Sequence, residues 1–213
     1  MVVAELMAVV SELVDAVARG ATPEAVAWLA EQLVIDPTRF RIAFAGAGRR
    51  LGQTSVIATP PIAWPASAGV DECGRGALVL AAVAAMDEGE HVTFVRDLIR
   101  RGDARERQAV LRVLAALPEP ARFVDIAVDA CRTNVRTVFD AIACDNAFPA
   151  AQFPDAAFFQ MVVKALFVEA PLARIVGLAD RRNGELVRMV EAFASERRAA
   201  GRAVPDDVKL VLA

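Results

Sequence analysis

The sequence predicts an all-α protein. Of its 213 residues, 56% are hydrophobic and 6% aromatic, and alanine, leucine, valine and arginine dominate. That mixture favours packed helices over β-sheet. Apolar residues recur at helical spacing between proline and glycine breaks, which indicates short helices joined by tight corners. We expect helical hairpins stacked as an irregular α-solenoid of the armadillo or HEAT type, with a compact helical bundle as the alternative.

Length, charge and cysteine content limit the function classes. A single domain over residues 1–213 is expected, and it can bury a core without a disulfide or metal staple. The 24 basic and 27 acidic residues leave no basic excess for a phosphate backbone, so nucleic-acid binding is not expected. Cys73, Cys131 and Cys144 are too scattered for a disulfide framework or zinc cluster. We expect buried reduced thiols, no metal and no cofactor.

The apolar runs are too short to cross a membrane. The longest, residues 77–86, has half of the roughly 20 residues that a bilayer requires. The N-terminus carries Glu5, Glu12 and Asp15 without a basic region, so it does not read as a signal peptide. We expect a cytoplasmic protein whose membrane contact is at most peripheral.

Start and stop signals divide the chain into helices. Thr22-Pro23 and Asp36-Pro37 each combine a capping side chain with a proline at the first helical position. Asp103 and Glu106 have the spacing of a capping box. The expected helices cover residues 1–19, 23–35, 37–50, 74–86, 90–101, 103–117, 120–131, 132–144, 155–169, 183–200 and 205–213.

Residues 41–52, RIAFAGAGRRLG, have the glycines of a dinucleotide-binding loop but not its spacing. The third glycine comes one position late, and no clear helix follows directly. A helix that frays into a loop accounts better for this segment. The proline-rich residues 51–69 come next, and we interpret them as a hydrophobic strap over one end of the core, with a functional loop as the alternative.

The most unusual composition lies between Cys131 and Leu178. The helix predicted at 155–169 is apolar all round, so we expect it to be buried, and Gln160 and Lys164 alone interrupt it. Because these two residues are four apart, they share one face. A buried ammonium is too costly to stay charged alone. Lys164 must therefore be paired, reach solvent or line a cavity.

The segment before that helix offers polar partners. One predicted polar stripe recurs every four residues, at Arg132, Arg136, Asp140 and Cys144. Phe-Pro pairs at 148–149 and 153–154 bracket a rigid connection, because each proline fixes φ and removes a donor. Polar groups from two helices and a stiff loop should converge. The candidate ligand-binding residues are Arg132, Asn134, Asp140, Asp145, Asn146, Gln160 and Lys164.

These residues allow two interpretations. In the first, they form a structural network that satisfies buried backbone groups and carboxylates. In the second, they line a pocket for a polar or amphipathic small molecule. Catalysis is a special case of the second, with a lysine beside an aspartate as general base or Schiff-base former. No residue is assigned a catalytic role, because His91 is isolated and no serine lies in a nucleophile motif.

Six motifs carry a family resemblance. They are CRTN at 131–134, FDAIACDNAFP at 139–149, FP at 153–154, QMVVKALF at 160–167, PLARIVGL at 171–178 and SERRAAGR at 195–202. In combination they resemble the EboA-domain family of bacteria and algae. Weaker similarity covers the N-terminal half, where Gly46 and Gly48 depart from the family pattern.

The resemblance implies a metabolic context. Family members are encoded beside a UbiA-like prenyltransferase homologue, a TatD-like metal hydrolase and a dehydroquinate-synthase-like enzyme, in a cluster associated with making or moving secondary metabolites. It implies a non-catalytic helical adaptor or metabolite-binding protein that supports biosynthesis or export of a secondary metabolite. The expected partners are proteins of the same cluster or a small-molecule metabolite. The alternative is an enzyme that acts on a small polar or prenylated metabolite through a Lys/Asp/Gln pocket.

Overall fold

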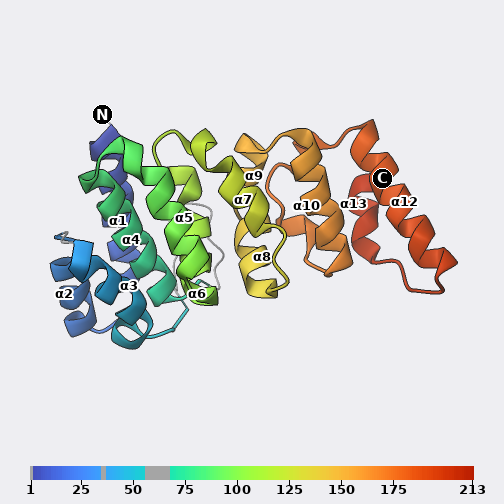
Figure 1. The fold of residues 1–213 in the computed structure, drawn as a ribbon. Helices are drawn as coiled ribbons and strands as arrows, with labels where there is room; N and C mark the ends of the chain where they lie inside the picture. Colours follow the sequence, from blue (N-terminus) through green and yellow to red (C-terminus); the bar gives the residue numbers. More distant parts are fainter. Residues whose placement is uncertain (1, 35–36, 56–67) are drawn as a thin grey trace. The chain divides into compact units, whose positions relative to one another are not determined.

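A computed structural model describes residues 2–34, 37–55 and 68–213 and confirms the all-α class (Figure 1). Within these ranges the β content is limited to an isolated antiparallel bridge between Ser55 and Gly69. The helices are α1 (Val2–Ala18), α2 (Pro23–Gln32), α3 (Pro37–Leu51), α4 (Val70–Ala85), α5 (His91–Arg101), α6 (Ala104–Val113), α7 (Val124–Ala130), α8 (Arg136–Ala143), α9 (Ala147–Gln152), α10 (Asp155–Phe167), α11 (Leu178–Arg181), α12 (Gly184–Ala199) and α13 (Lys209–Leu212). Short 3-10 helices are η1 (Glu88–Glu90), η2 (Leu114–Ala116), η3 (Pro120–Phe123), η4 (Leu172–Arg174) and η5 (Asp206–Val208).

The chain divides into two compact units, unit 1 (Met1–Ile126) and unit 2 (Ala127–Ala213). The single domain over 1–213 stays a prediction, as does the choice between stacked hairpins and a bundle. Most of the proline-rich stretch, residues 56–67, lies outside the described residues, so its interpretation as a strap or functional loop also stays open.

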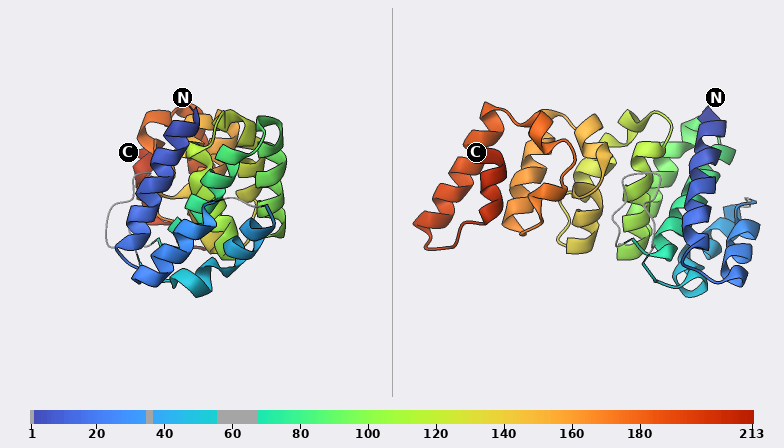
Figure 2. Two further views of the ribbon diagram at one scale, coloured as in Figure 1. Left: turned by 90° about the vertical axis from the view of Figure 1, so that its left-hand side faces the viewer. Right: turned by 180° about the vertical axis from the view of Figure 1, so that it is seen from behind.

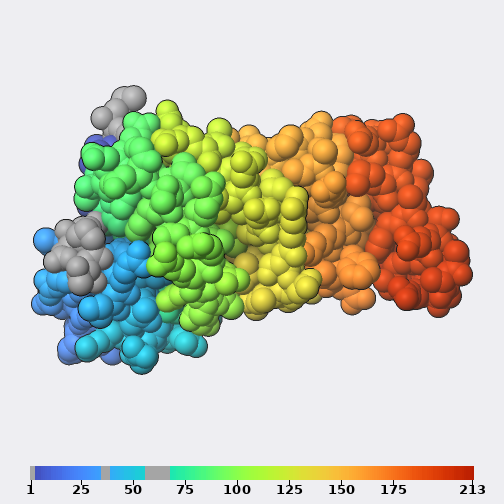
Figure 3. Space-filling model, viewed as in Figure 1, coloured from blue at the N-terminus to red at the C-terminus, as the bar shows by residue number. Residues whose placement is uncertain are grey.

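Helix α4 is the centre of unit 1. Helix α1 packs along it most extensively, and α3 and α6 cover its other sides (Figure 2). Helices α5 and α6 form the part of the surface of unit 1 that is coloured green in Figure 3. The inward stripe of α1 is the one its helical spacing predicts, because Leu6, Leu13 and Val17 are buried. The N-terminal helix therefore folds as an amphipathic cover on an almost wholly buried helix.

Helix boundaries follow local capping chemistry. The Asp103 carboxylate accepts from the Glu106 backbone N–H at 2.9 Å, and the Glu106 carboxylate accepts from the Asp103 N–H at 2.9 Å, which confirms the capping box. Helix α3 ends at Leu51, one residue beyond its expected end, and irregular backbone follows it. One expectation was wrong, because α4 begins at Val70 rather than Gly74. The earlier start places two acidic residues inside the buried helix.

Two helical glycines should respond oppositely to alanine. A Cβ at Gly46 would meet nothing within 4 Å, whereas one at Gly74 would lie 2.1 Å from Leu51 Cδ1. Gly46→Ala should raise the free energy of unfolding by about 0.5–1 kcal/mol through helix propensity. Gly74→Ala should lower it by about 1–3 kcal/mol through overpacking. Urea unfolding of the two variants measures both effects, and a stabilising Gly74→Ala would contradict the packing of α4 on α3.

In unit 2, α10 packs against α8, η4 and α12, and α13 packs on α12. The side chains of Phe148, Phe158 and Phe159 are fully buried, and the last two meet edge to face with ring centroids 6.4 Å apart. Val208 and Val211 anchor the C-terminus, whereas Leu210 is 49% exposed. Aromatic side chains therefore contribute much more to the core of unit 2 than to the packing of α1 against α4 in unit 1.

The three cysteines are free and buried, as the sequence predicts. Burial raises the pKa of the Cys73 thiol to about 12, and burial likewise raises the pKa of Cys131 to about 12. Both remain protonated at neutral pH. Because the thiolate is the reactive form, these side chains act as small apolar groups in the core.

Candidate functional site

Lys164 lines a pocket of about 250 Å³ in unit 2. Three parts of the unit build it: the turn before α8, helix α8 itself and the C-terminal part of α10. The lining residues are Thr133, Asn134, Arg136, Phe139, Lys164 and Val168. The pocket thus combines an apolar wall, an amide and two cationic side chains.

The Lys164 ammonium is held by backbone oxygens. It donates to the carbonyls of Cys131 and Thr133 at 2.5 and 2.6 Å, and it lies 5.1 Å from the centre of the Phe139 ring. No carboxylate among the described residues forms an ion pair with it. An ammonium has three N–H groups, so these two bonds leave one for another acceptor. Two carbonyl dipoles and the Phe139 ring therefore stabilise its positive charge, and no carboxylate in the described part of the chain neutralises it.

Burial lowers the pKa of Lys164 below the ordinary lysine value, because desolvation disfavours the charged form. The folded state therefore binds this proton less tightly than the unfolded state. As pH rises from the lowered pKa towards the ordinary one, this cost of burying the charge disappears. A ligand that supplies a negative charge to the pocket would restore the pKa of Lys164.

Arg136 fixes the opposite side of the pocket. Its guanidinium donates to Asp140 Oδ1 at 2.8 Å and to the backbone carbonyls of Val168 and Glu169. These carbonyls belong to the end of α10, where a cation compensates the partial negative charge of the helix. Arg136 is therefore a brace between α8 and α10, and Lys164 is the cation that a ligand can reach without breaking an ion pair.

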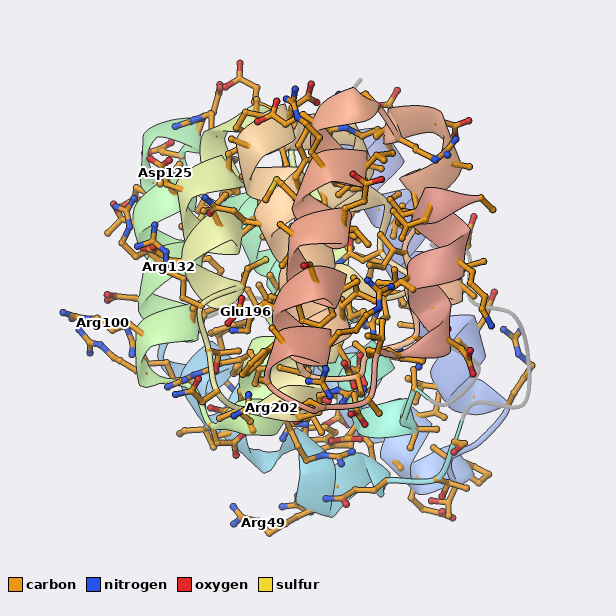
Figure 4. The ribbon with its side chains drawn as sticks, turned by 90° about the vertical axis from the view of Figure 1, so that its right-hand side faces the viewer. Arg49, Arg100, Asp125, Arg132, Glu196 and Arg202 are labelled. Carbon is orange, nitrogen blue, oxygen red and sulfur yellow. The ribbon has the colours of Figure 1, made fainter. Side chains whose placement is uncertain are left out.

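The structure brings together two of the seven candidates, Asn134 and Lys164. Gln160 is exposed and does not line the pocket. Arg132 is also exposed, and its side chain extends into solvent near Asp129, with an N–O distance of 3.5 Å (Figure 4). The predicted face of α10 therefore contributes one residue to the pocket rather than two.

The remaining three candidates have structural partners. Asp140 pairs with Arg136, and the Asp145 carboxylate accepts two hydrogen bonds from Arg174. Asn146 is 4% exposed; it donates to the Ala141 carbonyl and accepts from the Phe148 N–H, both at 2.9 Å. These contacts favour a structural network for Asp140, Asp145 and Asn146. They favour a small-molecule pocket for Asn134 and Lys164.

Three local expectations about this stretch were wrong. Helix α8 begins at Arg136, so Arg132 precedes it, and Cys144 is fully buried rather than part of a polar stripe. The Phe148-Pro149 pair lies inside the short helix α9, where a proline in the first turn costs no hydrogen bond. Helix α10 is not buried all round, because Phe167 is 64% exposed.

A second polar cluster, in unit 1, was not predicted. Asp71 is fully buried and pairs with Arg75 at 2.5 Å and with Arg105 at 2.5 and 2.9 Å. Arg75 also donates to the Phe44 carbonyl at 3.0 Å. One turn of α4 is thereby tied to α3 and α6. We call Asp71, Glu72, Arg75, Arg105 and Arg112 the buried ion cluster.

Glu72 and Arg112 complete this cluster, with an N–O distance of 3.4 Å and side chains only 13% and 5% exposed. Burial raises the pKa of Glu72 above its ordinary value. The four-residue spacing of Asp71 and Arg75 was visible in the sequence. It was missed because the expected helix began after both acids.

The comparisons with known proteins give one match. A family model described as metabolite traffic protein EboA matches residues 10–212. No curated protein and no solved structure matches the chain. In the described ranges, no group of three His, Cys, Asp or Glu side chains is placed to hold a metal, and no helix is both long and apolar enough to cross a membrane.

Proposed function

The chain belongs to the EboA family of metabolite traffic proteins, and from this premise we propose that it is a non-catalytic protein that binds a small organic anion. The bound molecule would be a secondary metabolite or its precursor, held during biosynthesis or export. Cytoplasmic location and partner proteins from the same gene cluster are part of this proposal.

The observation that carries the proposal is that no carboxylate within the described ranges forms an ion pair with the Lys164 ammonium. Among the described residues, Lys164 bonds only to two backbone carbonyls, although it lines a pocket open to ligands. A carboxylate or phosphate would complete its third hydrogen bond and compensate the charge. Phe139 and Val168 supply apolar contact for the rest of the molecule, and Asn134 offers an amide. Such a mixture is typical of small-molecule sites.

The alternative, an enzyme with a Lys/Asp/Gln pocket, has less support. That mechanism requires an aspartate and a glutamine beside Lys164, with the acid or base within hydrogen-bond reach of the proton it transfers. Asp140 is engaged by Arg136, and Asp145 by Arg174. Gln160 is exposed outside the pocket lining. Binding without chemistry is therefore the function that this geometry favours.

Removal of the Lys164 charge should weaken anion binding by about 10- to 100-fold, the usual value of a charge-assisted hydrogen bond. We choose phenyl phosphate as the probe and Lys164→Met as the variant, because methionine keeps most of the apolar stem. Ligand-observed NMR titration measures the affinity. Binding should also weaken as pH rises through the lowered pKa of Lys164, because the neutral amine no longer attracts the phosphate.

The chain provides a matched control. Lys164 and Lys209 are its two lysines, and Lys209 is an exposed residue that pairs with Asp206 at 2.7 Å. Lys209→Met should leave the affinity unchanged, and benzyl alcohol, which lacks the phosphate, should not distinguish wild type from Lys164→Met. Equal phenyl phosphate affinity in both lysine variants would overturn the proposal.

A further inference from the structure

Unit 1 contains a hollow between α2 and α3 with a volume of about 440 Å³. It is lined by Trp28, Gln32, Ile42, Ala43, Gly46, Arg49 and Arg50. We call it the α2–α3 groove. Its lining includes no acidic residue, and it shares no residue with the Lys164 pocket.

The floor of the groove is a glycine that the fold itself does not need. Gly46 lies in the middle of α3, where glycine costs about 1 kcal/mol relative to alanine. The neighbouring Gly48 has a packing reason, since a Cβ there would lie 3.3 Å from the Arg75 guanidinium. A Cβ at Gly46 would meet nothing within 4 Å. The missing side chain at Gly46 leaves the groove open and the helix backbone accessible.

Two side chains of the groove wall are apolar and partly exposed, although polar atoms make up more of the lining surface than apolar atoms do. Ile42 is 71% exposed, although it lies on a helix that has buried partners on its other face. Trp28 lies across from it on α2 and is half-buried. An indole face and a branched aliphatic side chain on either side of a glycine form a slot suited to a flat apolar body.

The rim of the groove is positively charged. Arg49 and Arg50 are exposed, and within the described residues neither forms an ion pair; the Arg49 side chain extends beyond the ribbon of α3 (Figure 4). Helix α3 carries no acidic residue at all. The helix dipole accounts for cations in the last turn. It does not account for an open glycine about one turn earlier or an exposed isoleucine about two turns earlier.

We infer that the α2–α3 groove binds an amphipathic organic anion, with a flat or extended apolar body between Trp28 and Ile42 and an acidic group on Arg49 and Arg50. Guanidinium groups are matched to carboxylate, sulfonate and phosphate oxygens, which they can bind through paired hydrogen bonds. The apolar body gains from burial against Trp28, and the backbone at Gly46 permits close approach. This site is independent of the proposed Lys164 site.

The test uses 1-anilinonaphthalene-8-sulfonate, a fused-ring aromatic anion whose fluorescence is excited by energy transfer from tryptophan. The chain has two tryptophans, and Trp64→Phe removes the second one, so the signal reports on Trp28. We expect saturable binding to one site. Gly46→Phe should fill the floor and weaken binding at least tenfold, with the melting temperature maintained, because that position has open space.

Two further arms separate charge from apolar contact. The double variant Arg49→Gln/Arg50→Gln should weaken binding of the sulfonate at least tenfold. N-phenyl-1-naphthylamine has the same ring system without the sulfonate. It should bind the wild type more weakly than the sulfonate does, and it should bind the wild type and the double variant with equal affinity. Arg188→Gln/Arg198→Gln, a pair of exposed arginines on α12, serves as the matched control and should change nothing.

The outcomes distinguish this site from the Lys164 pocket. Lys164→Met should leave energy transfer from Trp28 intact, and Gly46→Phe should leave phenyl phosphate binding to the Lys164 pocket intact. The inference is overturned if Gly46→Phe binds the sulfonate as tightly as the wild type, or if Arg49→Gln/Arg50→Gln and the α12 control behave alike. Loss of transfer in Lys164→Met would assign the binding to the other pocket and also overturn it.

Discussion

Asp71→Asn should lower the free energy of unfolding by about 3–5 kcal/mol, the cost of removing one partner from a buried ion pair. The Asp71 carboxylate is fully buried and accepts hydrogen bonds from Arg75 and Arg105. Arg75 is itself 3% exposed, so its charge would stay in the core without compensation. Urea unfolding followed by circular dichroism measures the loss.

The matched control is Asp97→Asn on α5. Asp97 pairs with Arg100 and Arg101 at 3.6 and 3.2 Å, and both arginine side chains are more than half exposed. Solvent screens such pairs, so the change should cost at most about 1 kcal/mol. If both variants lose the same small amount, the buried ion cluster is not a main support of unit 1.

The same cluster predicts an acid-dependent difference. Burial opposes the charged form of Asp71 most strongly, but Arg105 and Arg75 together outweigh it and lower the pKa of this carboxyl below its ordinary value. Its stabilisation is therefore complete above the unfolded pKa of about 3.9 and is lost as pH falls through the lower folded pKa. The stability gap between wild type and Asp71→Asn should be constant near neutrality and shrink below about pH 4.

Signals that act within one turn could be predicted from the sequence. The capping box at Asp103 needs only its own residues and Glu106, so residue spacing alone specifies it. Amphipathic spacing likewise specifies the buried stripe of α1. The end of α3 was also predicted to within one residue, but the reason for a glycine at position 48 was not. A Cβ at Gly48 would lie 3.3 Å from the Arg75 guanidinium on α4, and no local pattern reveals that neighbour.

The candidate site shows the same limit. The sequence singled out Lys164 as a cation that needs partners, because the helix around it is apolar. Its partners are carbonyls 31 and 33 residues earlier in the chain, and backbone acceptors have no residue type. Gln160 and Lys164 share a helix face, but Gln160 is exposed and does not line the pocket. Four-residue spacing predicts a common face, but it does not predict which part of that face other segments cover.

Asn146→Ala and Asn134→Ala separate residues that hold the fold from residues that face a ligand. Asn146 caps α9 and bonds to the end of α8 from a position that is 4% exposed. Alanine there removes the cap and leaves a buried carbonyl and N–H without these bonds, so we expect a loss of about 2–4 kcal/mol. Asn134 is exposed at the pocket, so alanine should change stability by less than about 0.5 kcal/mol.

Phenyl phosphate binding should respond in the opposite order. Asn134→Ala should weaken it several-fold, because the pocket loses its amide, whereas folded Asn146→Ala should bind like the wild type. Thermal melting and NMR titration of the same samples give both quantities. A stable Asn146→Ala variant that no longer binds would move this residue from the fold into the site.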